Sequence, residues 1–91
     1  MVMREQVELT FARVENPERK VKLTAYLDDE IAYYAILAAK RLGLRPDEEF
    51  GLFTPSGIPV KHASSATVRG VISKYGTTSF HIVSADSPAV A

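Results

Sequence analysis

Alternation between apolar and polar residues marks two segments near the start of the chain, residues 7–14 and 21–27. From Val7 to Phe11 the odd positions are apolar and the even positions are polar, which is the period of a half-buried strand. Residues 15–20, between the two segments, include an Asn-Pro pair that favours a turn. The pattern therefore predicts an antiparallel hairpin.

A helical pattern follows, from about Glu30 to Leu42. Asp28 or Asp29 is placed to cap its first turn, where a carboxylate accepts hydrogen bonds from free amides and favours the positive end of the helix dipole. Gly43 is placed for the left-handed conformation that commonly ends a helix. The apolar stripe predicted to face the sheet consists of Ile31, Ala35, Ala38 and Leu42.

Shorter elements fill the rest of the chain. They are a strand at 49–53, a turn at 54–57, an extended segment at 58–62, a short helix at about 65–76 and a last strand at 78–83. Ser65 or Thr67 is predicted to cap the short helix and Gly76 to end it. We therefore expect one domain, residues 1–83, followed by a disordered tail, residues 84–91.

This α+β order of elements resembles the ubiquitin-like β-grasp superfamily. In "GLRPDEEFGLF" a helix-ending glycine is followed by an aliphatic residue and a Pro-Asp pair that leads into a strand, as in ubiquitin. "ATVRGVISKYGTTSFHIV" is similar to the capped short helix and last strand of ubiquitin. The resemblance implies a mixed four- to five-stranded sheet, one long helix packed across it and a short second helix.

The end of the chain bears on which activity of the superfamily to expect. Modifiers and sulfur carriers of this superfamily are activated at a C-terminal Gly-Gly, but the last glycine here is Gly76, and the tail "SADSPAVA" contains none. The chain therefore resembles the non-conjugating members, which are non-catalytic protein-protein interaction modules. A modifier or sulfur carrier, and a small auxiliary subunit of a multicomponent enzyme, remain the alternatives.

The amino-acid composition excludes several further classes of function. The 91 residues include 11 basic and 11 acidic side chains, so the formal charge is zero and nucleic-acid binding is not expected. Four basic residues nevertheless gather near the hairpin turn: Arg13, Arg19, Lys20 and Lys22. The absence of cysteine excludes thiol catalysis and cysteine-ligated metal centres. The longest apolar run, residues 31–39, is far shorter than the roughly 20 residues that span a bilayer. We expect a soluble, cytoplasmic protein with no membrane partner.

Candidate catalytic groups are sparse. His62 and His81 are the only histidines, and neither has an acid or a nucleophile beside it in the sequence. Ser64 is better explained as part of the helix cap than as a nucleophile, since no base is evident. We therefore expect no enzymatic activity, and no catalytic, cofactor or metal site.

Two surfaces are candidates for docking to another protein or to a second copy of the chain. The first is the outer side of the long helix, where large apolar residues stand at positions expected to be polar: Tyr33, Ile36 and Leu37. The second follows from the resemblance to ubiquitin, whose recognition patch lies on the open face of the sheet. The matching positions are Leu52, His81 and Val83.

Overall fold

The computed structural model of the chain describes residues 5–61, 63 and 65–85. His62, Ser64 and residues 86–91 of the predicted tail lie outside this part. In chain order the elements are β1 (Gln6–Arg13), β2 (Asn16–Tyr26), α1 (Ile31–Arg41), β3 (Phe50–Phe53), α2 (Val68–Tyr75) and β4 (Ser79–Ser84). The predicted α+β class is confirmed.

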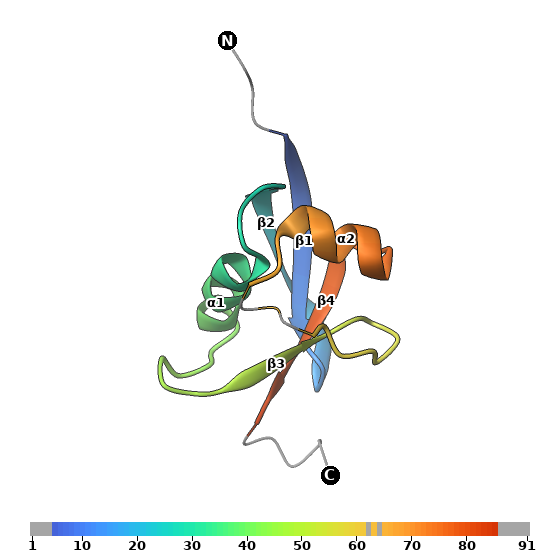
Figure 1. The fold of residues 1–91 in the computed structure, drawn as a ribbon. Helices are drawn as coiled ribbons and strands as arrows, with labels where there is room; N and C mark the ends of the chain where they lie inside the picture. The colour runs from blue at the N-terminus through green and yellow to red at the C-terminus, as the bar shows by residue number, and fades with distance from the viewer. Residues whose placement is uncertain (1–4, 62, 64, 86–91) are drawn as a thin grey trace.

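The four strands form one mixed sheet in the order β2-β1-β4-β3 (Figure 1). The two central strands, β1 and β4, run parallel, and each pairs with an antiparallel outer strand. α1 packs across β1 and β2, and its 11 residues make it the longer of the two described helices. The sheet is thus assembled from the two ends of the chain, with the helices on its core face.

The first hairpin is confirmed, but its predicted turn at residues 15–20 is wrong. β2 already begins at Asn16, so only two residues separate the strands. Ala12 pairs with Lys20 whereas Arg13 pairs with Asn16, so residues 17–19 bulge out of the ladder. Pro17 fits there because a residue in a bulge need not donate an amide hydrogen bond to the neighbouring strand. The Asn-Pro pair therefore marks a bulge.

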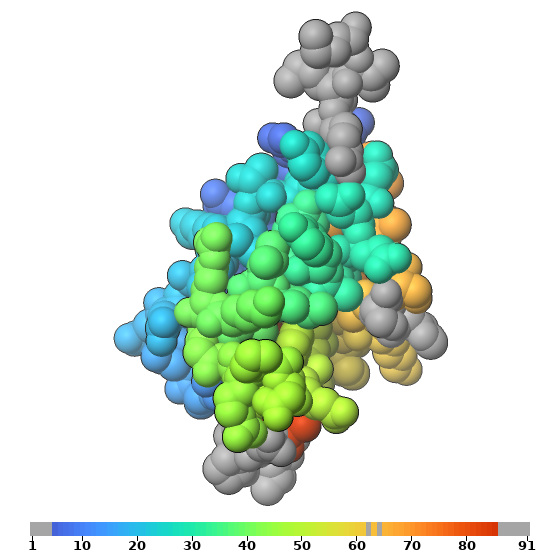
Figure 2. Space-filling model, turned by 90° about the vertical axis from the view of Figure 1, so that its left-hand side faces the viewer, coloured from blue at the N-terminus to red at the C-terminus, as the bar shows by residue number. Residues whose placement is uncertain are grey.

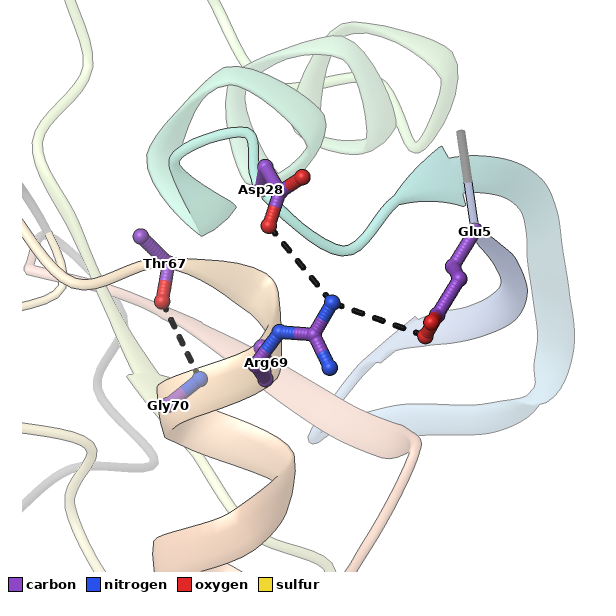
Figure 3. A network of polar contacts seen from close by, with 5 residues as sticks. All are labelled: Glu5, Asp28, Thr67, Arg69 and Gly70. Atoms are coloured by element: carbon purple, nitrogen blue, oxygen red, sulfur yellow. Dashed lines mark hydrogen bonds and ion pairs between the residues drawn. The ribbon is translucent and has the colours of Figure 1, made fainter. Parts of the chain in front are cut away.

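The predicted cap of α1 is also wrong. The N-cap residue is Glu30, and its side chain makes no capping bond. The first helical amide, that of Ile31, instead donates to the carbonyl oxygen of Ala66 at 3.0 Å. Asp28 is used elsewhere: its carboxylate and that of Glu5 lie 3.6 and 3.5 Å from the guanidinium of Arg69, which joins the start of α2 to both segments (Figure 3).

The predicted end of α1 is confirmed. Gly43 follows the helix with a φ of 92°, in the left-handed region that glycine adopts without strain. The amide of Leu44 then donates to the carbonyl oxygen of Ala39 at 3.0 Å, which returns the chain to the core.

The extended segment predicted at residues 58–62 is not a strand in the described residues. It contributes one isolated bridge, between Phe53 and Pro59, and a hydrogen bond of 2.8 Å from the amide of Val60 to the carbonyl of Leu52. Because Pro59 has no amide hydrogen, it cannot extend a ladder. The predicted turn before it is present, closed by the amide of Gly57 donating to the carbonyl of Thr54 at 2.9 Å.

The short helix α2 matches its prediction closely. The hydroxyl oxygen of Thr67 accepts from the amide of Gly70 at 3.1 Å (Figure 3), and Gly76 ends the helix in the left-handed conformation. Of the two predicted caps, Thr67 rather than Ser65 is the N-cap residue.

Thr67→Ala should lower the free energy of unfolding by about 1 kcal/mol, because it removes the acceptor for an amide of the first turn. Thr67→Ser keeps that acceptor and is the matched control. Urea denaturation followed by circular dichroism measures both. Equal stability of the alanine and serine variants would show that the cap contributes nothing.

The core lies between the sheet and α1, and α2 closes one end of it. Its least exposed members are Leu9, Phe11, Ala25, Ile31, Ala38, Val68, Phe80 and Ile82. The packed region extends past the predicted boundary at residue 83, because β4 includes Ser84 and the amide of Ala85 donates to the carbonyl of Glu49 at 2.9 Å.

Candidate protein-binding surfaces

The three residues predicted on the outer side of α1 differ in exposure and border different hollows of the surface. Tyr33 and Ile36 are 59% and 49% exposed, while Leu37 is half-buried against the core. Tyr33 and Leu37, four residues apart, line the hollow next to β2, whereas Ile36, the neighbour of Tyr33 one turn on, lines a different hollow near Phe50. The two hollows can therefore be tested separately.

A groove runs between α1 and β2, and we call it the α1–β2 groove. Its volume is about 650 Å³ and it is open to solvent. Figure 2 shows the face of the molecule on which α1 lies, with the β1–β2 hairpin along one side. The residues that line the groove are Leu23, Thr24, Tyr26, Asp29, Glu30, Tyr33, Tyr34 and Leu37.

A buried tyrosine fixes the shape of this groove. The hydroxyl of Tyr34 donates to a carboxylate oxygen of Asp29 at 2.7 Å and accepts from the backbone amide of Tyr26 at 3.1 Å. Burial is the main cause that raises the pKa of Tyr34 above its ordinary value, and Asp29 raises it further. The neutral hydroxyl therefore ties α1 to the end of β2.

Tyr33 is positioned by Tyr34. The two rings meet edge to face with their centroids 5.0 Å apart, a favourable geometry for aromatic pairs. One face of the Tyr33 side chain is thus supported while the rest of it is exposed to solvent. A large aromatic side chain held in this way can contact a partner with little further loss of conformational freedom.

The two ends of α1, along which the groove runs, carry opposite charge. Asp29 and Glu30 line the groove near the start of α1. At the other end of α1, the guanidinium of Arg19 donates to the carbonyl oxygen of Arg41 at 3.1 Å, which places the Arg19 cation beside the last helical turn with its basic residues Lys40 and Arg41. A charged rim around an apolar floor is typical of protein interfaces.

The second predicted surface, on the open face of the sheet, needs a correction at Leu52. This side chain is only 5% exposed and pairs with Ile82, whose side chain is fully buried. Because successive side chains of a strand point to opposite faces, Leu52 belongs to the core and cannot form an exposed patch.

His81 and Val83 do alternate with the buried residues of β4, so they lie on the open face, where both are half-buried. Their partners across the sheet are Phe53 and Gly51. A Cβ atom at Gly51 would come within 3.0 Å of the Phe53 ring, so this ring lies close over the glycine. Phe53 was missed by the sequence reasoning, and the inward positions of β4 together with the strand register identify it.

The carboxylate of Glu48, which contacts the end of β4, has a perturbed pKa. The hydroxyl of Ser84 donates to Glu48, the amide of Arg45 donates to the same carboxylate at 3.2 Å, and the Arg45 guanidinium lies 3.6 Å away. These contacts, that of Ser84 first, lower the pKa of Glu48.

A group whose pKa is lowered by folding stabilises the fold above its unfolded pKa, and this contribution is lost as the pH falls through its folded pKa. Ser84→Ala should therefore raise the pKa of Glu48 and narrow the acidic range over which its contribution is lost. An NMR titration of the Glu48 carboxyl carbon in the wild type and the variant measures this change. Identical titration curves would contradict the assigned role of Ser84.

Metal-binding clusters and membrane-spanning helices were also sought in the described part of the chain. No three acidic or histidine side chains gather there closely enough to hold a metal ion, and no described helix has the length and apolar character needed to cross a membrane. The chain matches no protein-family model and shows no significant similarity to a curated protein.

Proposed function

We propose that this chain is a ubiquitin-like β-grasp domain of the non-conjugating kind, and that it is a non-catalytic protein-protein interaction module. The mixed sheet with a central parallel pair and a helix across it is compatible with a β-grasp. The observation that carries the function is the α1–β2 groove, where an exposed tyrosine stands beside an apolar floor. A cytoplasmic location is part of the same proposal.

The groove suits a protein partner better than a small molecule. It is open along its length, whereas small ligands are usually bound in enclosed pockets that bury most of their surface. The half-buried Leu37 provides apolar area, and Tyr33 offers a large side chain with a polar tip, which is enriched at protein interfaces.

The alternatives use the chain differently. A modifier or sulfur carrier would act through an activated C-terminal glycine. An auxiliary subunit of a multicomponent enzyme would use the same groove but form a stable stoichiometric complex. Nucleic-acid contact is disfavoured because the chain has no net positive charge.

Tyr33→Asp tests the proposal, with Ile36→Asp as the matched control, because Ile36 is exposed on the same helix but does not line the groove. We expect the aspartate at position 33 to weaken partner capture by about tenfold or more, because a charge then replaces an aromatic anchor. Both side chains are exposed, so both variants should fold. Capture from an extract of the source organism, quantified by mass spectrometry, provides the measurement.

Equal capture by the wild type and by Tyr33→Asp would show that the groove is not the docking site. Loss of capture in the Ile36→Asp variant alone would place the interface at the other hollow, near Phe50. Circular dichroism of both variants guards against unfolding as the cause.

A further inference from the structure

The groove borders an exposed sheet edge, and the backbone polarity of that edge can be deduced. β2 is an outer strand. The amide of Thr10 in β1 donates to Thr78, on the β4 side, at 3.0 Å. Because backbone groups alternate in direction along a strand, the amides and carbonyls of Leu9 and Phe11 point toward β2. They bond to the backbone of their partners, Leu23 and Val21. The amides and carbonyls of Lys22 and Thr24 consequently point away from the sheet.

These outward groups have no use within the fold as far as the structure describes it. Within residues 5–61, 63 and 65–85, no hydrogen bond joins the backbone of Lys22 or Thr24 to a group beyond the edge. Tyr26, the next outward residue, is different, because its amide donates to the Tyr34 hydroxyl and its carbonyl accepts from Asp29. The stretch of β2 whose outward backbone groups are available for pairing therefore ends before Tyr26.

The two ends of β2 differ in how they meet solvent. Its first half holds Pro17, a bulge and several charges, which are devices that prevent strand pairing. The segment from Val21 to Tyr26 is regular and borders the groove. The opposite edge of the sheet, at β3, is covered in part by the bond from Val60 to Leu52. The regular half of β2 is thus the open edge of the sheet.

We propose that a second copy of this chain pairs with that edge, so that the two sheets join through antiparallel β2 strands across a two-fold axis. The inference rests on the proposed docking role of the groove and names its occupant. Lys22 of each copy pairs with Thr24 of the other and exchanges both backbone hydrogen bonds. This register avoids placing Lys22 opposite itself, which would be unfavourable. It also places the two Leu23 side chains opposite each other on the core face.

Charge favours this occupant. Each copy carries Asp29 and Glu30 in its groove near the start of α1, and Arg19 and Arg41 beside the end of α1. An antiparallel two-fold arrangement brings the acidic end of one copy to the basic end of its mate. Such an edge is complementary to itself, as a two-fold symmetric interface requires. The apolar floors then face each other, with Tyr33 and Leu37 contributed by both copies.

The first test is Thr24→Pro, with Thr24→Ala as its control. Proline removes the outward amide and leaves the hydrogen bonds to β1 intact, whereas alanine keeps the amide. Sedimentation equilibrium over about 10–500 µM, a range suited to a small interface, gives the dimer dissociation constant. We expect a concentration-dependent dimer for the wild type and the alanine variant. For the proline variant we expect the dimer dissociation constant to rise tenfold or more, which favours the monomer.

The second test reverses the charges. Glu30→Arg alone should weaken dimerisation, and adding Arg41→Glu should recover part of it, because the second change removes the like-charge repulsion that the first creates. A different protein partner would not be restored by this exchange. Both residues are exposed, so folding, checked by circular dichroism, should persist.

Several results would overturn the inference. A wild type that is monomeric throughout, or a dimer unaffected by Thr24→Pro and by Glu30→Arg, excludes pairing through β2. A dimer lost only on Phe53→Asp would place self-association on the open face of the sheet. A monomeric chain that still loses capture of other proteins with Tyr33→Asp would refute the second copy as occupant and leave the proposed function standing.

Discussion

Leu52→Asp unfolds the domain, whereas Phe53→Asp at the next residue leaves it folded. Leu52 is 5% exposed and faces Ile82 across the core side of the sheet. A carboxylate there would lose its hydration without gaining a partner, at a cost of about 4 kcal/mol or more. That is a large share of the roughly 5–15 kcal/mol that stabilises a typical domain.

Phe53→Asp is the matched control because Phe53 lies on the open face of the same strand. Far-ultraviolet circular dichroism and urea denaturation measure both variants. If Leu52→Asp unfolded at the same urea concentration as the wild type, Leu52 would be a surface residue, as the resemblance to ubiquitin had suggested.

Tyr34→Phe should lower the free energy of unfolding by about 1–3 kcal/mol, because it leaves the partly buried amide of Tyr26 without the Tyr34 hydroxyl as acceptor. It also removes the 2.7 Å bond to Asp29. Tyr33→Phe, which loses a hydroxyl from an exposed ring, is the control and should be neutral. Urea denaturation at neutral pH compares the two. Equal destabilisation of both variants would contradict the structural role of Tyr34.

The same hydroxyl should make the free energy of unfolding fall at alkaline pH. Since folding raises the pKa of Tyr34, the stability that its neutral form contributes is complete below the ordinary tyrosine pKa of about 10 and is lost as the pH rises through the folded value. Tyr34→Phe should remove this contribution to the alkaline loss of stability, while Tyr33→Phe retains it.

Local signals were enough to predict most elements of the fold. Alternation identified β1 and the regular half of β2. Thr67 and Gly76 were correctly predicted as the residues that cap the two ends of α2. Each of these depends on residues close together in the sequence. The helix-ending glycine, Gly43, is of the same kind.

The errors involve contacts between distant segments. The amide of Ile31 is satisfied by Ala66, far along the chain, so a local capping rule selected the wrong residue. Leu52 and Phe53 are both large and apolar, and only the pairing with β4 determines which of them faces the core. The bulge at Pro17 likewise depends on the register with β1.

The candidate site could be predicted only in part. Tyr33 and Leu37 were identified because helical spacing places them away from the core stripe. Their separation from Ile36, and the groove beside β2, depend on where α1 rests on the sheet. The sequence alone does not determine that placement.

Photo-crosslinking from position 33 tests the docking role of the α1–β2 groove most directly. A benzophenone amino acid replaces Tyr33 in one sample and Ile36 in another, and each protein is irradiated in an extract of the source organism. We predict adducts with another protein chain, either a second copy or a different protein, from position 33 and not from position 36. Adducts from position 36 alone, or from neither position, would contradict docking through the groove.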